Sequence, residues 1–217
     1  GAEVIAFAVE NNIQMVDLKF TDLPGTLQHV TLPIAFLDQY LFDEGTGFDG
    51  SSIRGFQTID ESDMLLVPDP NSAAIDPILE IPTLSLTCNV RDPITSKNYT
   101  RDPRWIAQKA EEHLKSSGIA DVSYWGPELE FFIFDTARFD QNAQSGFYFV
   151  DSDEGIWNSG AEIALSGELN QSYHTKHKQG YFPAAPVDSM TDLRSEAVLK
   201  MSNFGIDVEK HHHEVAT

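Results

Sequence analysis

Two glutamates separated by one residue are the first feature of the sequence that could hold a metal ion. Glu128 and Glu130 lie in the segment YWGPELEFFIF, whose aromatic and β-branched residues predict a buried strand. Because side chains two positions apart in a strand point to the same face, both carboxylates should face the same way. Adjacent negative charges repel each other, and a divalent cation between them removes that cost. We expect a metal site here; the alternative is a solvent-facing edge strand with two surface glutamates.

Four consecutive residues, His211, His212, His213 and Glu214, form a second candidate site. The apolar residues on both sides predict a strand, in which His212 and Glu214 share one face and His211 and His213 share the other. An imidazole beside a carboxylate can bind a metal or a phosphate, so the His212 face could join the two glutamates. The alternatives are imidazoles packed in a core, or the remnant of a purification tag, against which the following residues EVAT argue.

A glycine-flanked loop presents a further carboxylate. In FDGSSI, Asp49 is followed by Ser51 and Ser52, and such a loop could offer the carboxylate to a small cationic substrate. The same residues are typical of an Asx turn or a helix cap, and the residues alone favour that simpler interpretation.

The composition argues against several classes of protein. The chain has 217 residues and a formal net charge of -20, so its field should repel nucleic acid and anionic membranes. Cys88 is the single cysteine, which leaves no intramolecular disulfide or cysteine-based zinc site and favours a reducing, cytoplasmic compartment. The sequence has no apolar stretch long enough to span a bilayer, no signal-peptide pattern and no glycine-rich phosphate loop or dinucleotide fingerprint. Any ATP site must therefore be built in another way.

The first hundred residues predict a small domain built on a sheet. Residues 1–12 predict a short amphipathic helix, and the alternating segments IQMVDLKF and LQHVTLP predict a β-hairpin around a Pro-Gly turn. A short helix or turn should follow over residues 34–42. EGTGFDGSSIRG contains too many glycines for regular structure, which predicts a loop. MLLVPDP and ILEIPTLSLTCNV predict further strands of the same sheet, so the first domain is expected at residues 1–100.

Residues 101–217 predict a second domain that begins with a helix. Asp102 suits the N-cap, and Pro103 the first turn, of a helix over WIAQKAEEHLKSSG. SYWGPELEFFIFD should then be an extended, mostly buried strand. Residues 141–179 predict long loops or a hairpin around FYFVD, residues 187–205 another helix, and residues 206–217 a strand. The predicted fold class is α+β.

Five segments together resemble one known family. FDGSSIRGF, ESDMLLVPDP, GPELEFFIF, GYFPAAPVDS and EKHHHEVAT occur in the order found in bacterial type I glutamine synthetases, and the resemblance covers nearly the whole chain. It implies a small N-terminal β-grasp domain, followed by the first part of a catalytic domain with an antiparallel sheet and helices. It also implies a homo-oligomer, a double-ring dodecamer, whose active sites lie between neighbouring subunits.

The resemblance assigns the metal-binding residues. Glu130 and Glu214 match ligands of the metal that holds the substrate side, and Glu128 matches a ligand of the metal that holds the ATP phosphates. Mg²⁺ or Mn²⁺ is the expected ion. The chain stops at Thr217, immediately before the position of a further metal-binding glutamate in that family, so we expect little synthetase activity from these 217 residues alone.

The resemblance also assigns residues around ammonium. Asp49, contributed by a neighbouring subunit, is expected to bind ammonium and to help deprotonate it. Tyr181, Ser52 and Asp63 are expected to line the ammonium pocket.

Two further residues are assigned to the nucleotide. Glu209 matches a position that contacts the nucleotide, and His212 one that lies near the phosphates. Strand alternation would put Glu209 on the face opposite Glu214, so this assignment needs a bulge or a contact from the far side of the strand.

The implied reaction has two steps. The γ-carboxylate of glutamate attacks the γ-phosphate of ATP, and ammonia then displaces phosphate from γ-glutamyl phosphate. Other activities remain open: a ligase of the same superfamily that joins glutamate to a polyamine or another amine, and a noncatalytic metal-binding or assembly protein with this fold. A zinc hydrolase is more distant, because the sequence lacks H-E-x-x-H spacing.

Overall fold

The computed structural model describes residues 1–160 and 167–216. The chain forms two compact units, the first made of Gly1–Trp125 with Asn203–Gly205 and the second of Gly126–Ser202 with Ile206–Thr217. The mixture of helices with mostly antiparallel strands confirms the predicted α+β class. Residues 161–166, part of the predicted loop region 141–179, and the last residue of the predicted C-terminal strand lie outside the described residues.

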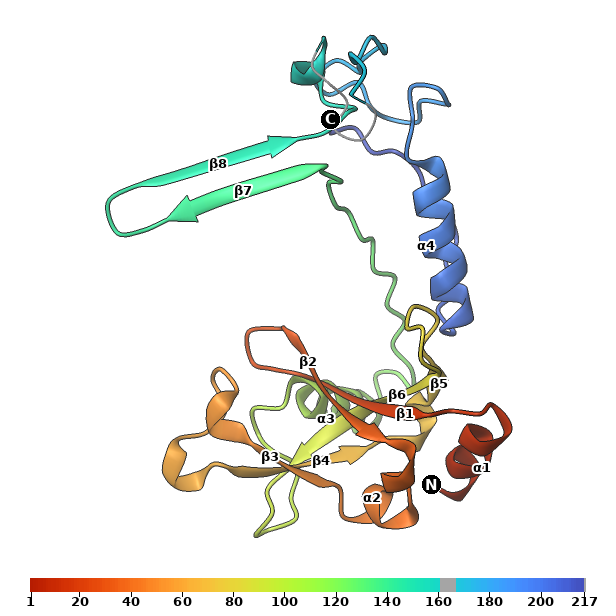
Figure 1. Cartoon of the computed structure of the whole chain (residues 1–217). Helices are drawn as coiled ribbons and strands as arrows, with labels where there is room; N and C mark the ends of the chain where they lie inside the picture. Colours follow the sequence, from red (N-terminus) through yellow and green to blue (C-terminus); the bar gives the residue numbers. More distant parts are fainter. Residues whose placement is uncertain (161–166, 217) are drawn as a thin grey trace. The chain divides into compact units, whose positions relative to one another are not determined.

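The first unit is built on one mixed sheet (Figure 1). The strand order is β2-β1-β6-β4-β3, and the short β5 also pairs with β6. β1 and β6 run parallel, and the other pairs of this sheet are antiparallel, including the predicted β1-β2 hairpin. The strands are β1 (Met15–Thr21), β2 (Leu27–Pro33), β3 (Thr46–Asp49), β4 (Asp63–Pro68), β5 (Ala74–Ile75) and β6 (Thr83–Arg91).

Two short helices complete the hydrophobic core of the first unit. α1 (Ala2–Glu10) and α2 (Gln39–Asp43) occur where the sequence predicted them, with a 3-10 turn directly before α2. Their buried side chains belong to the same cluster as those of β1, β4 and β6. Members of this cluster with no exposed surface are Ala8, Val16, Leu18, Leu66, Leu84, Leu86 and Val90.

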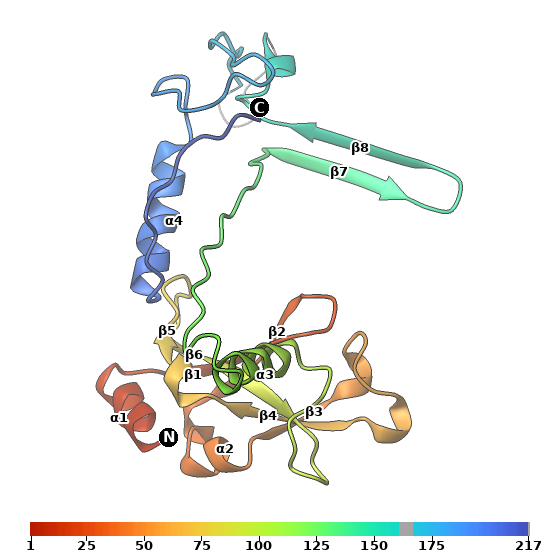
Figure 2. The same cartoon turned by 180° about the vertical axis from the view of Figure 1, so that it is seen from behind.

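The helix α3 (Pro103–Ser116) begins as the sequence predicts, at a buried N-cap. One oxygen of Asp102 accepts a hydrogen bond from the Arg104 backbone N at 2.9 Å, and the other accepts from the Val90 backbone N at 3.0 Å. Burial raises the pKa of the Asp102 carboxyl, and these bonds oppose that rise. The helix lies behind the sheet in Figure 1 and in front of it in Figure 2. Asp102 therefore ties α3 to β6.

The predicted loop over EGTGFDGSSIRG is wrong in its central part. β3 pairs with β4, and Gly50–Ser52 form a 3-10 turn. Two of the glycines are required by this structure, one for its backbone conformation and one for close packing. Gly45 takes a φ of 81° at the start of the strand, and a Cβ on Gly50 would lie 2.6 Å from Met64 Sδ.

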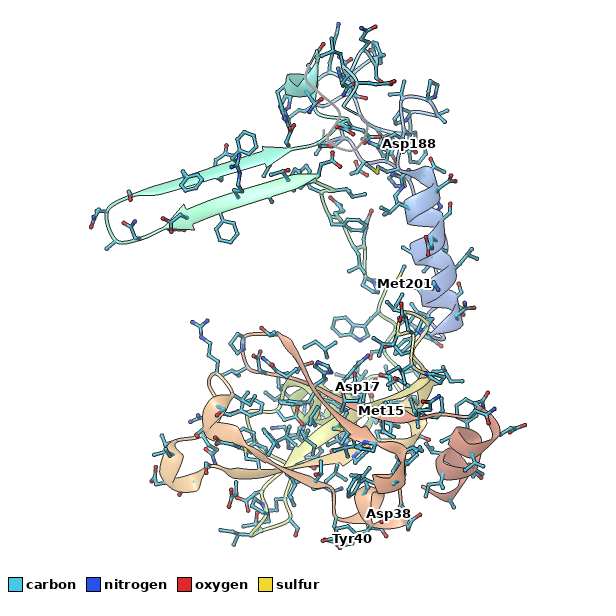
Figure 3. All side chains as sticks on the ribbon, viewed as in Figure 1. Met15, Asp17, Asp38, Tyr40, Asp188 and Met201 are labelled. Atoms are coloured by element: carbon cyan, nitrogen blue, oxygen red, sulfur yellow. The ribbon has the colours of Figure 1, made fainter. Side chains whose placement is uncertain are left out.

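The second unit contains a hairpin, loops and a helix. β7 (Thr136–Gln141) and β8 (Gly146–Asp151) form the antiparallel hairpin predicted around FYFVD. α4 (Thr191–Asn203) confirms the second predicted helix. Figure 3 shows Asp188 at its N-terminal end, where the carboxylate accepts from the Met190 backbone N at 3.1 Å.

Two predicted strands do not form. Neither residues 123–135 nor residues 206–216 pair with any described strand. The prediction that the first segment is mostly buried is also wrong, because Trp125 is 87% exposed and Leu129 is 74% exposed. Apolar composition favours a strand only where another strand supplies a continuous ladder of backbone partners and another surface covers the side chains. The described residues supply isolated backbone bonds instead, from Asp135 N to Asp151 O and from Phe182 N to His213 O.

The helices of the described residues include none with the length and apolar character needed to cross a membrane.

Candidate functional site

Asp49 ends β3, and its carboxylate is held by the two serines that follow. Oδ1 accepts from the Ser51 backbone N at 2.9 Å and from Ser51 Oγ at 2.6 Å, and Oδ2 accepts from Ser52 Oγ at 2.8 Å. Hydrogen bonds from Ser51 and then from Ser52 lower the pKa of Asp49 below its ordinary value. The Asx turn and cap favoured by the residues alone are present, and they leave an ionised carboxylate exposed to solvent.

Asp63 opens β4 directly opposite Asp49. Directly opposed side chains of an antiparallel pair share a face, and two like charges placed there repel each other. The Gly50 backbone N donates to Ser62 O at 2.6 Å, which holds the ends of the two strands together. The opposed pair is therefore a small patch of negative charge that a cation would stabilise.

Glu128 and Glu130 are both exposed, in the unpaired segment of the second unit. Neither carboxylate makes a hydrogen bond or an ion pair with another described residue. Their hard oxygen donors have the chemistry that Mg²⁺ and Mn²⁺ require. Within residues 1–160 and 167–216, however, no three Asp, Glu, His or Cys side chains lie close enough to hold a metal ion. The convergence of these glutamates with Glu214 stays a prediction.

The second unit brings Tyr181, His212 and Glu214 together. The His212 ring lies edge-on to Tyr181 and Phe182, with centroid distances of 5.4 and 4.4 Å, and those two rings stack at 4.2 Å. Glu214 Oε2 lies 3.7 Å from His212 Nδ1. Phe182 adopts a φ of 62°, a conformation that costs a bulky residue about 1–3 kcal/mol and is found mainly where the surroundings impose it.

The arrangement around His212 indicates where its proton lies. His212 Nδ1 is 3.0 Å from the backbone oxygen of His213. Because a carbonyl oxygen only accepts, Nδ1 carries the proton, and Nε2 is left for another partner.

Residues 211–214 form no strand, and only the predicted proximity of His212 and Glu214 is present. His211 Nε2 lies 3.2 Å from Ser195 Oγ on α4, and His213 Nε2 lies 3.4 Å from Glu154 Oε2. His212 and Glu214 instead approach each other.

Glu209 is exposed and makes no hydrogen bond with any described residue, so its predicted role at the nucleotide rests on the sequence alone.

Two models of one protein family match consecutive parts of the chain. Residues 12–93 match the glutamine synthetase β-grasp domain, and residues 100–217 match the glutamine synthetase catalytic domain. The chain belongs to the glutamine synthetase family. The resemblance inferred from five sequence segments is therefore confirmed, and so is the predicted order of a β-grasp domain before a catalytic domain.

Curated glutamine synthetases match the chain over nearly its whole length. It is 52% identical over 215 residues to the glutamine synthetase of Nostoc sp., which covers 99% of this chain and 45% of that relative. It is 53% identical over 215 residues to that of Aquifex aeolicus, covering 99% of this chain and 44% of the relative. The chain thus spans about half the length of the curated relatives it matches.

A solved glutamine synthetase has the same fold. The cryo-EM structure of the Plasmodium falciparum enzyme superposes with a TM-score of 0.85 at 25% identity, covering 100% of this chain and 42% of that one.

Several residues near the glutamine synthetase motifs were not singled out from the sequence. Glu154 contacts His213, Arg194 pairs with Asp188, and Arg194 Nε lies 3.4 Å from His211 Nδ1. Burial opposes ionisation of Asp188, but hydrogen bonds from Thr191 and Arg194 outweigh it and lower the pKa of Asp188. Only the helix-start pattern DSMT carried a local signal for any of these residues.

Proposed function

We propose that this chain supplies the β-grasp domain, residues 1–100, and the start of the catalytic domain, residues 101–217, of a glutamate-ammonia ligase. The enzyme forms glutamine from glutamate, ammonium and ATP through γ-glutamyl phosphate. Family membership supports the reaction class. The observation that carries the choice of ammonium is the exposed, ionised Asp49 directly opposite Asp63.

Asp49 acts on ammonium. Together with Asp63 it supplies negative charge that attracts a small cation, and Ser52 and Tyr181 line the pocket. The Asp49 that serves each active site belongs to a neighbouring subunit. Only neutral ammonia has a lone pair for attack, so ammonium must lose a proton next to a carboxylate before the second step. The hydrogen bonds from the serines favour the ionised form of Asp49 and hold its carboxylate in place, which supports this role.

Glu128, Glu130 and Glu214 would hold Mg²⁺ or Mn²⁺, Glu130 and Glu214 on the substrate side and Glu128 on the phosphate side. Carboxylate oxygens are the hard donors that these cations prefer, and one or two of them at each ion leave positions for phosphate and water. When bound, the ions neutralise charge on the transferring phosphoryl group.

His212 and Glu209 serve the nucleotide. His212 would reach the phosphate region through Nε2, because its Nδ1 is engaged with the His213 carbonyl oxygen, and Nε2 donates to a phosphate oxygen when the ring is an imidazolium. Glu209 is exposed and free to contact the nucleotide.

The enzyme is further proposed to be a cytoplasmic homo-oligomer, a dodecamer with active sites between subunits. A single cysteine forms no intramolecular disulfide, which fits a reducing compartment. Burial raises the pKa of Cys88 to about 12, so this thiol is unreactive.

The decisive experiment measures glutamine formation by a polypeptide with the full length of its relatives. Turnover should require ATP, glutamate, ammonium and Mg²⁺ or Mn²⁺. Asp49→Asn should lower kcat by about 10²–10⁴-fold, the usual contribution of a positioned acid or base. Asp121→Asn, at another exposed aspartate, is the matched control and should leave the rate unchanged.

Three results would redirect the proposal. A polyamine that replaces ammonium with a higher kcat/KM would make the protein an amine ligase. Metal binding without any turnover would make it a noncatalytic relative. Steady glutamine synthesis by the 217 residues alone would show that the site does not need the rest of the relatives' length.

A further inference from the structure

The three adjacent histidines have different surroundings in the second unit. His211 is bound to α4, and His212 packs on aromatic rings. His213 contacts a carboxylate from a distant part of the unit: its Nε2 lies 3.4 Å from Glu154 Oε2, an ion pair when the imidazole is protonated. Its Nδ1 lies 2.8 Å from both Gly180 O and Glu214 O. His213 is therefore held from both sides of its ring.

Glu154 is itself fixed from its other oxygen. Oε1 accepts from the Ser189 backbone N and from Ser189 Oγ, both at 2.6 Å. The side chains of His213 and Glu154 are 13% and 22% exposed, so water competes little for the contact. Glu154 lies in the turn after β8. Its carboxylate thus connects this turn to Ser189, shortly before α4, and to His213 in the segment 211–214.

The backbone of His213 lies between the two residues assigned to the active site. Phe182 N donates to His213 O at 3.3 Å, and His212 Nδ1 faces the same oxygen at 3.0 Å. Glu214 follows directly, and its Oε2 approaches His212 Nδ1 to 3.7 Å. A shift of this backbone would move the His212 ring and the Glu214 carboxylate together.

We propose that Glu154 is a positioning residue: through His213 it fixes the backbone that presents His212 and Glu214 on one side of the segment. Glu154 itself touches none of the residues assigned to substrate or metal, so it acts only through His213. A carboxylate that orients an imidazole commonly sets the geometry of neighbouring ligands. The inference rests on the proposed function, because that function gives His212 and Glu214 their roles.

The test compares Glu154→Ala with Glu154→Gln in a polypeptide of the relatives' full length. Glu154→Ala should weaken Mn²⁺ binding and lower kcat/KM for glutamate by about 10- to 100-fold, the usual cost of losing a residue that orients a ligand. Glu154→Gln should restore most of both, since its amide oxygen still accepts from Ser189 and its amide nitrogen can donate to His213. Glu196→Ala, at an exposed glutamate of α4, is the control and should behave as wild type.

A measurement independent of activity distinguishes a loss of positioning from a folding defect. In the 217-residue chain, the nuclear Overhauser contact between the His212 and Tyr181 rings should disappear in Glu154→Ala and persist in Glu154→Gln, with unchanged helix content by circular dichroism. An active enzyme in which Glu154→Ala keeps its Mn²⁺ affinity and kcat/KM would overturn the positioning role alone. A wild-type protein that neither binds Mn²⁺ nor forms glutamine would overturn the proposed function instead.

Discussion

The two units bury their apolar residues to very different extents. Among the described residues, every buried apolar side chain lies between Val4 and Tyr99, in the first unit. Large apolar side chains of the second unit are exposed, Leu129 by 74% and Phe139 by 81%. The buried side chains described in the second unit are instead polar: Ser152, Asn158, Asn170, Thr175 and Asp188.

The two units are therefore stabilised by different interactions, the first by burial of apolar side chains and the second by hydrogen bonds. Burial of apolar surface is the main favourable contribution to folding, so the first unit carries most of the stability of these 217 residues. The second unit is ordered by hydrogen bonds, such as those from the Asn170 amide to Asp153 O at 2.8 Å and to Asn158 Oδ1 at 3.0 Å. Each such bond adds only about 1 kcal/mol net. The candidate site residues of the second unit can thus be held by many hydrogen bonds although that unit contributes little to the free energy of unfolding.

A matched pair of leucines gives the largest test of this comparison. Leu86→Ala removes a fully buried side chain of the first unit and should lower the free energy of unfolding by about 2–5 kcal/mol. Leu129→Ala removes an exposed one in the second unit and should change it by no more than about 0.5 kcal/mol. Urea unfolding followed by circular dichroism measures both, and similar losses would break the comparison.

A pair of glycines tests how closely the first unit's core is joined to the Asp49 turn. Gly50→Ala would place a Cβ 2.6 Å from Met64 Sδ, a buried side chain, and should cost about 1–3 kcal/mol by overpacking. Gly47→Ala meets no atom within 4 Å and should cost less than about 0.5 kcal/mol. Thermal unfolding of the two variants decides the matter; equal midpoints would show that the turn moves independently of the core.

The smallest expected effect concerns Asp49, whose carboxylate is held by hydrogen bonds from residues of the first unit alone. Ser51→Ala removes the largest cause of the lowered pKa of Asp49, so that pKa should rise toward its ordinary value. A carboxylate with a lowered folded-state pKa stabilises the fold above its unfolded pKa, and this contribution is lost as the pH falls through the folded value. In the variant, the stabilisation that ionised Asp49 gives the turn should therefore be lost at a higher pH than in the wild type.

Carboxyl ¹³C shifts followed by NMR titration measure this pKa directly. Ser116→Ala, in α3, is the control and should leave the titration of Asp49 unchanged. A Ser51→Ala variant in which Asp49 titrates as in wild type would show that the hydroxyl does not hold the carboxylate.

Local sequence patterns predicted those elements whose causes are local. The β1-β2 hairpin followed from alternation around a Pro-Gly turn, and α3 from Asp102 before Pro103. The segment 123–135 shows the limit, because its apolar residues indicate a strand wherever a partner exists and cannot reveal whether one does. β3 was missed for the opposite reason, since its glycines hid a strand that β4 supplies with partners.

The candidate site divides in the same way. The Asx turn at Asp49 and the approach of Glu214 to His212 involve near neighbours in the sequence, and both could be predicted. The contact of Glu154 with Ser189 joins residues 35 positions apart in irregular segments. Polar side chains in loops follow no period, so no sequence pattern marks such a pair.

The carboxylate of Asp102 has a practical consequence for dissecting the protein. The family's β-grasp model ends at residue 93 and its catalytic model begins at residue 100, yet Asp102 supplies the acceptor for the Val90 backbone N. A β-grasp fragment cut at residue 100 would leave that amide unsatisfied inside the sheet. A cut after Gly118 would carry α3 along and keep the Asp102 acceptor for the Val90 amide, so the family's domain boundary and the end of a separable fragment differ.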